Sequence, residues 1–238
     1  IQRGSSVMKL IAEGFAVTME LALLSMVVAT LIALPAGMVS ALRQNKMVDH
    51  LSRIVALLGV SIPNFFLGIV MILVFGVYFL LPWGAGGFVA IGESISGNLL
   101  RMILPAIALG TAYAAIVMRM MRSSMLDVMG QDYVRTAKAM GIQKYSIVLR
   151  DIARNAMIPV VTVMGNSFGY LLGGSIVTET VFRLPGMGNL VITAVFRRDF
   201  PVIQGIVLAI VVVRIIVNLL VDLTYSSIDP RIRYGGSK

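Results

Sequence analysis

The chain has 238 residues, of which 58% are hydrophobic and only 13% are charged, and its formal net charge is +9. Soluble domains carry about 25% charged residues, so this composition excludes a soluble domain and predicts an integral membrane protein. The absence of cysteine excludes a disulfide framework and thiol chemistry.

Five segments are long and apolar enough to cross a membrane as helices, since about 20 apolar residues span the hydrocarbon core. In chain order they are residues 15–42, 54–81, 99–118, 156–178 and 203–225. The sequence therefore predicts an all-α membrane protein, a polytopic bundle of five spans that forms a single transmembrane domain over residues 1–238.

Basic residues predict the orientation of these spans, because cytoplasmic connectors carry an excess of lysine and arginine. The connectors 43–53 and 119–155 and the tail from residue 226 hold most of them. They are Arg43, Lys46, Arg53, Arg119, Arg122, Arg135, Lys138, Lys144, Arg150, Arg154, Arg231, Arg233 and Lys238. The opposite connectors hold only Arg183, Arg197 and Arg198. The two basic connectors and the C-terminus are therefore predicted to be cytoplasmic.

This orientation places Ile1 outside if the chain has five spans. The chain begins with isoleucine rather than methionine. Of the two explanations, an N-out protein or a sixth span before Ile1 in the full protein, we favour the sixth span.

The connector 119–155 is far longer than a link between neighbouring spans needs to be. Residues 131–140 contain good helix formers, and Gly141 suits the left-handed position that ends a helix. A second helix is expected from Ile142 to about Ala156, because its apolar residues are spaced for one face. Two interpretations remain open: a lever that docks on a soluble cytoplasmic partner, or an amphipathic helix on anionic lipid.

Glycines recur every four residues in the fourth predicted span, at Gly165, Gly169 and Gly173. Small residues at this spacing let helix backbones approach closely, so we expect a helix-packing seam. A substrate path lined by the same face is the alternative. Pro63, Pro105 and Pro159 are weaker signals of helix bending.

Arg214 is expected near the middle of the last span, where a charge costs about 2.5–3.5 kcal/mol on the insertion scale. Intramembrane ionisable residues are functional hypotheses by default. Arg214, Asn166 and Glu20 are therefore candidates for a substrate path in which Arg214 meets an anionic group. The favoured alternatives for Arg214 are an ion pair, for example with Glu20, or snorkelling to an interface.

Residues 135–141 read Arg-Thr-Ala-Lys-Ala-Met-Gly, which resembles the EAA loop of permease subunits of binding-protein-dependent ABC importers. That signature is Glu-Ala-Ala, three residues, then Gly; the departure at its first two positions and the late Pro159 resemble the dipeptide, oligopeptide and nickel branch. Four further blocks match this branch: 61–66, 179–188, 198–205 and 229–233. The loop sequence Arg-Thr-Ala-Lys-Ala resembles that of the first of the two paired permeases more than that of the second. The resemblance covers nearly the whole chain from Glu13 onward.

The resemblance implies an ATP-driven importer in the bacterial inner membrane, with this chain forming half of a translocation path for short peptides. Its partners would be a related second permease, two cytoplasmic ATPases, an external solute-binding protein and the lipid bilayer. The loop 119–159 would couple the spans to an ATPase cleft through Arg135, Thr136, Ala137, Lys138, Ala139, Met140 and Gly141. The glycine seam would pack against the second permease. A nickel importer of the same branch is the alternative.

No catalytic residue, metal site or cofactor is predicted in this chain. It lacks a Gly-x-x-x-x-Gly-Lys-Ser/Thr phosphate loop, so ATP and Mg²⁺ would be bound by the partner ATPases. It has one histidine, and its methionines are scattered through apolar spans as packing material. A secondary transporter would require midplane acids or inverted repeats, and neither is evident. A structural membrane protein, with its loop on lipid, is a third possibility.

Overall fold

The computed structural model describes residues 6–228, without the side chains of 221, 222 and 224–228. Every regular element in this range is helical. In chain order the elements are α1 (Val7–Leu42), α2 (Met47–Ser61), α3 (Asn64–Ile72), a π-helical segment (Leu73–Tyr78), α4 (Ile95–Met129), α5 (Asp132–Ala139), α6 (Lys144–Ser146), a second π-helical segment (Ile147–Ala153), α7 (Arg154–Phe182), α8 (Met187–Phe196) and α9 (Phe200–Ile228). The predicted basic tail, with Arg231, Arg233 and Lys238, lies outside the described residues, as does the block 229–233.

The all-helical prediction is confirmed, and so is the number of spans if a bent helix pair counts as one. Four helices are long and apolar enough to cross a membrane alone: Val7–Leu42, Ile95–Met129, Lys144–Phe182 and Phe200–Leu220. The fifth span consists of Met47–Ser61 and Asn64–Tyr78, which meet at an angle of 95°. The second span therefore runs from Met47 to Tyr78 rather than over the predicted residues 54–81, and it bends beside Pro63, one of the prolines that signalled helix bending.

Proline explains the break in this span. Pro63 has no N–H for the helix and forces the residue before it out of the helical region. Ile62 is accordingly extended, with φ −82° and ψ 121°, and α3 starts afresh at Asn64. Pro105 lies inside α4 without ending it, so only the tertiary structure distinguishes a break from a tolerated proline.

The core lies where α1 crosses α4. Small residues recur every four positions along α1 and are all buried: Ser25, Ala29, Ala33, Gly37 and Ala41. A Cβ atom on Gly37 would lie 2.7 Å from the carbonyl oxygen of Met118, and one on Gly110 would lie 2.8 Å from that of Ser25. The two backbones therefore touch directly, which is what small-residue spacing permits between membrane helices.

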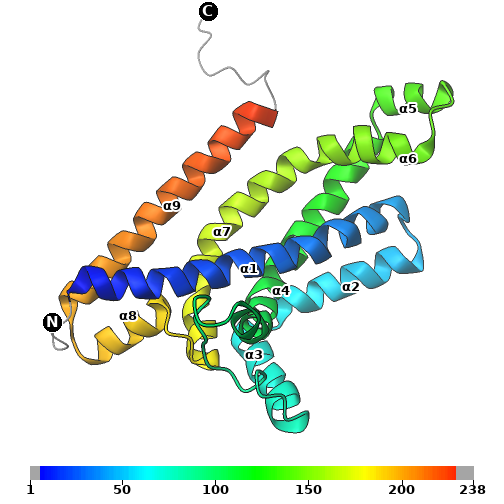
Figure 1. Cartoon of the computed structure of the whole chain (residues 1–238). Coiled ribbons are helices and arrows are strands. Elements are labelled where there is room, and N and C mark those ends of the chain that lie inside the picture. The colour runs from blue at the N-terminus through cyan, green and yellow to red at the C-terminus, as the bar shows by residue number, and fades with distance from the viewer. Residues whose placement is uncertain (1–5, 229–238) are drawn as a thin grey trace, which may run out of the picture.

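The two ends of the bundle carry different elements (Figure 1). The helices α5 and α6 lie at one end, towards which the α1–α2 connection also points, whereas α8 and the start of α1 lie at the opposite end. The basic residues predict the α5 end to be cytoplasmic. The predicted connector 119–155 is mostly helical, because α4 continues to Met129 and a helix resumes at Lys144.

Candidate functional site

The predicted coupling segment forms a compact hairpin at the end of the bundle. α5 covers Asp132–Ala139, and Gly141 follows with φ +76°, a left-handed conformation that glycine adopts without steric cost. The amide of Ile142 then donates to the carbonyl of Ala137 at 3.2 Å. The predicted sequence of helix, glycine turn and helix is therefore confirmed, although the second helix begins at Lys144 rather than Ile142.

One face of α5 is buried against the helix that leads into α7. Val134 and Ala137 are buried, as are Ile147, Val148 and Ile152 of the π-helical segment, and α5 contacts this segment. The side-chain amide of Asn155 donates to the hydroxyl of Tyr133 at 3.1 Å, although both residues are exposed. The apolar face predicted for the second helix is thus used only in part, by Val148 and Ile152, to fix α5 to the base of α7.

The opposite face of α5 is exposed. Of the seven predicted coupling residues, only Ala137 is buried; Arg135, Thr136, Lys138, Ala139, Met140 and Gly141 are exposed. Met140 is 67% exposed and Tyr145 is 76% exposed. The tip therefore combines apolar side chains with basic ones, a composition suited to a protein groove. Its role in binding an ATPase stays a prediction.

A buried aspartate that the sequence did not reveal joins the α1–α2 connection to α4 at the same end of the bundle. Asp49 of α2 is fully buried and accepts hydrogen bonds from Nε and Nη2 of Arg122 at 2.7 and 2.8 Å. The Ser40 hydroxyl donates to it at 2.7 Å and the Asn45 amide at 2.9 Å. Such two-pronged pairs are among the strongest charge-assisted contacts. The pair fixes the α1–α2 connection to the extension of α4.

A second buried acid lies at the opposite end of the bundle. Glu179 of α7 is fully buried and accepts from the Thr18 hydroxyl at 2.7 Å and from the backbone amides of Gly188 and Asn189 at 2.8 and 3.3 Å. The amide of Met187 donates to the Thr18 hydroxyl at 2.9 Å. Glu179 and Thr18 therefore cap the start of α8 from two other helices, and together satisfy its first three N–H groups.

The predicted glycine seam is not continuous within this chain. A Cβ atom on Gly169 would lie 3.6 Å from Cγ of Arg214 in α9, whereas a Cβ atom on Gly173 would meet nothing within 4 Å. Gly165 is half-buried. Packing of this face against a second permease stays a prediction, which the open surroundings of Gly173 permit.

The three candidates for a substrate path do not come together. Arg214 and Asn166 are both exposed, and the side chain of Arg214 reaches α7 one turn beyond Asn166, at Gly169. Glu20 lies instead beside the side chain of Asn98 in α4. Among the described residues no ion pair joins Glu20 to Arg214, so that suggested pairing is wrong within this chain.

The sequence is similar to those of known transport proteins. A family model described as the binding-protein-dependent transport system inner membrane component matches residues 33–234. The dipeptide transport system permease protein DppB of Escherichia coli (strain K12) is 42% identical over 242 residues, which cover 92% of this chain and 71% of DppB. A putative peptide permease protein of Brucella suis biovar 1 is 44% identical over 227 residues, covering 94% of this chain and 70% of that protein. The glutathione transport system permease protein GsiC of Escherichia coli (strain K12) is 44% identical over 224 residues, with coverages of 94% and 70%.

Solved structures show the same fold at lower identity. A chain of the MetNI methionine ABC transporter, solved in inward-facing conformations, superposes with a TM-score of 0.74 at 18% identity, covering 93% of this chain and 97% of that one. A chain of an amino acid ABC transporter gives a TM-score of 0.66 at 16% identity, covering 92% and 94%. This chain belongs to the family of binding-protein-dependent transport system inner membrane components, and is a multi-pass, non-catalytic permease of an ABC importer that works with ATPase and binding-protein partners.

Proposed function

We propose that this permease forms half of the inner-membrane path of an importer for short peptides. The observation that supports a peptide substrate is the identity of 42–44% with a dipeptide permease, a putative peptide permease and a glutathione permease. These alignments cover more than nine-tenths of the chain, including the helices that cross the membrane. A homologous second permease forms the other half of the path, and lipid surrounds the pair.

The exposed face of α5 and the turn at Gly141 are the site at which one of two cytoplasmic ATPases docks. Support comes from the tip of the hairpin, where the large apolar side chains of Met140 and Tyr145 are exposed beside basic residues. An amphipathic helix lying on lipid would instead turn its apolar face to the membrane. Here that face, with Val134 and Ala137, is buried on the protein.

Movement at α5 is carried along rigid elements. α5 packs on a helix that runs without a break from Lys144 to Phe182, and the Ser124 hydroxyl of α4 donates to the carbonyl of Ala156 at 2.9 Å. Glu179 lies near the far end of the same helix and holds α8. A displacement of α5 therefore reaches the opposite end of the bundle through packed helices and buried hydrogen bonds, the kind of physical connection that coupling requires.

The test is ATP hydrolysis and labelled-substrate uptake by the assembled complex in proteoliposomes with its binding protein. The panel contains di- to pentapeptides, glutathione and chelated Ni²⁺. Stimulation by peptides, with uptake that needs ATP, is the expected result. A response to nickel alone would assign the chain to a nickel importer, and uptake without ATPase partners would overturn the importer mechanism for this complex.

A further inference from the structure

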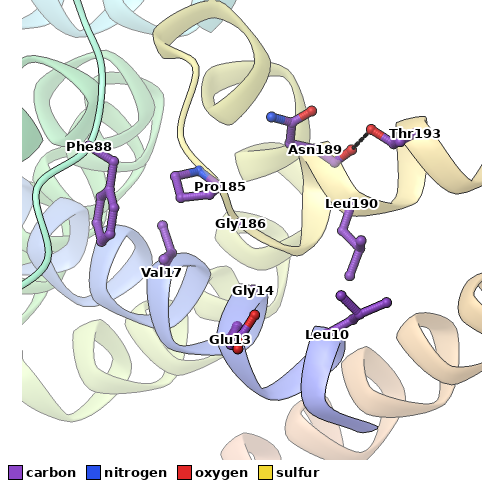
Figure 2. Close-up of a pocket in the computed structure, with 10 residues that line it drawn as sticks. All are labelled: Leu10, Glu13, Gly14, Val17, Phe88, Pro185, Gly186, Asn189, Leu190 and Thr193. Carbon is purple, nitrogen blue, oxygen red and sulfur yellow. Dashed lines mark hydrogen bonds between the residues drawn. The ribbon is translucent and has the colours of Figure 1, made fainter. Parts of the chain in front are cut away.

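A groove lies between α1 and α8, at the end of the bundle opposite α5 (Figures 1 and 2). It has a volume of about 380 Å³ and is lined by successive turns of α1, by the start of α8 and by Phe88 of the α3–α4 connector. In Figure 2, Leu10 and Leu190 face each other across it, and so do Val17 and Pro185. The distribution of basic residues predicts this end to be external.

The floor of the groove is preformed. A Cβ atom on Gly14 would lie 3.1 Å from the backbone nitrogen of Met187, so α1 and the start of α8 are in direct contact below the groove. One turn further along α1, Thr18 and the buried Glu179 hold the same end of α8. The opening is therefore a feature of a fixed helix pair and does not depend on a loose packing of two surfaces.

The polar atoms of the groove favour a cation. The start of a helix ordinarily attracts anions through its free N–H groups, but here Met187 donates to Thr18, and Gly188 and Asn189 donate to Glu179. The side-chain amide of Asn189 donates to the carbonyl of Leu184 at 3.3 Å, and the Thr193 hydroxyl donates to the carbonyl of Asn189 at 2.9 Å. The N–H groups at the start of α8 and the Thr193 hydroxyl therefore already have acceptors within the protein.

Glu13 supplies the charge. Among the described residues it is the only charged one that lines the groove, it is exposed, and its carboxylate forms no hydrogen bond or ion pair with any other residue in that part of the chain. The groove is otherwise lined largely by apolar side chains, those of Leu10, Val17, Phe88 and Leu190 among them. An acid at the edge of an apolar groove matches a lysine or arginine, whose methylene stem packs on apolar surface while its head group stays accessible.

We propose that this groove receives a lysine or arginine side chain of the external solute-binding protein, with Glu13 as the counter-ion. The proposal rests on the proposed function, because a binding protein must dock on the external face to deliver its substrate. The free α-ammonium group of a peptide offers the same charge without an aliphatic stem, so the apolar walls favour a side chain.

The test titrates the wild-type complex in proteoliposomes with substrate-loaded binding protein and follows ATP hydrolysis. Glu13→Gln is expected to raise the half-saturating concentration of binding protein about two- to fivefold, and Glu13→Lys to raise it further through repulsion, while the rate at saturation is retained. The affinity of Glu13→Gln should also depend less on salt. Glu93→Lys is the matched control, because Glu93 is an exposed acid of the same end that does not line the groove.

A second measurement does not depend on activity. The chain has no cysteine, so Glu13→Cys and Glu93→Cys introduce single thiols for a short thiol-to-amine cross-linker. A cross-link from position 13 to the binding protein, and none from position 93, is expected.

Equal half-saturation in wild type, Glu13→Lys and Glu93→Lys, with no cross-link from position 13, would overturn the docking site. A raised KM for peptide at saturating binding protein would instead assign the groove to the peptide ammonium. Stimulation of the wild type by its binding protein reports on the proposed function separately, and its absence would overturn both proposals.

Discussion

The hydroxyl of Thr18 in α1 donates a 2.7 Å hydrogen bond to Oε1 of Glu179 in α7, 161 residues away. Both side chains are buried, and the same hydroxyl accepts from the amide of Met187 at the start of α8. One threonine therefore joins three helices at the end of the bundle that carries the groove.

Replacing Thr18 with valine keeps the shape of the side chain and removes both hydrogen bonds. The amide of Met187 and one carboxylate oxygen of Glu179 then lose a buried partner, which should cost about 2–3 kcal/mol of stability. The measurement is the thermal unfolding of the purified complex. Thr18→Ser retains the hydroxyl and should stay close to wild type; a valine variant as stable as the serine variant would contradict the structure.

Removing one partner of the Asp49–Arg122 ion pair should cost much of the protein's stability, because the other charge is then left without its counter-ion. Asp49→Ala should destabilise the protein by about 3–5 kcal/mol, because it leaves the Arg122 guanidinium without its counter-ion. The double variant with Arg122→Met should lose less than the sum of the two single variants, as a double-mutant cycle will show. Arg53 provides the control: its contact to Asp49 is 3.8 Å and its side chain is 42% exposed, so Arg53→Ala should cost at most about 1 kcal/mol.

A bulky side chain at position 141 should impair coupling to the ATPases without unfolding the permease. Its φ is +76°, and a Cβ atom at this position would meet nothing within 4 Å, so a substitution in the isolated chain costs only about 1–2 kcal/mol of backbone strain. Gly141→Trp should leave the permease folded yet release the ATPases or uncouple them, as measured by co-purification and by stimulated ATP hydrolysis. Gly141→Asn, which tolerates this conformation, should retain both. Full coupling in the tryptophan variant would remove the turn from the docking site.

Two glycines within membrane-spanning helices, Gly110 of α4 and Gly173 of α7, should respond differently to replacement by leucine. Gly110→Leu forces a side chain into the α1–α4 contact, where the Ser25 carbonyl leaves only 2.8 Å for a Cβ, and should lower the yield of folded chain. Gly173→Leu should leave the chain itself intact, since its surroundings within the chain are open. If the predicted seam with the second permease exists, size-exclusion chromatography of Gly173→Leu will show loss of the paired complex; intact pairs would remove Gly173 from that seam.

Substitutions of Arg214 test whether its positive charge contributes to peptide uptake. Its side chain packs beside Gly169 and is exposed, so Arg214→Leu should be tolerated by the fold. If Arg214 meets an anionic substrate group, uptake of the peptide will have a raised KM in Arg214→Leu and be partly restored in Arg214→Lys. Unchanged uptake in the leucine variant would end the substrate-contact hypothesis.

Local rules predicted much of the coupling hairpin correctly. The glycine turn follows from the left-handed conformation that only glycine adopts freely, and the helix after it follows from the spacing of its apolar residues. What these rules missed was the extent of the neighbouring helices. Arg119 and Arg122 were placed in a connector because they are charged, whereas α4 continues through both of them, since a helix does not end where the membrane does.

The same small-residue pattern occurs in two places and has two outcomes. Along α1 it lies in the tight contact with α4, and along α7 it faces Arg214 at Gly169 and open surroundings at Gly173. The seam in α1 could have been found from its spacing alone, at Ser25, Ala29, Ala33, Gly37 and Ala41. Nothing in the sequence, however, says which of two similar stripes faces a helix of the same chain.

The sequence by itself determined the helical class, the five apolar segments, the glycine turn and the family, because these depend on composition, periodicity and contiguous motifs. Only the tertiary structure decided that the second span bends by 95° and that Asp49 and Glu179 are buried. The tertiary structure also decided that α1 and α8 enclose a groove beside Glu13. The physical reason is that a carboxylate is stable inside a protein only when partners from distant segments supply its hydrogen bonds, and the distance between such segments is not a property of the linear chain.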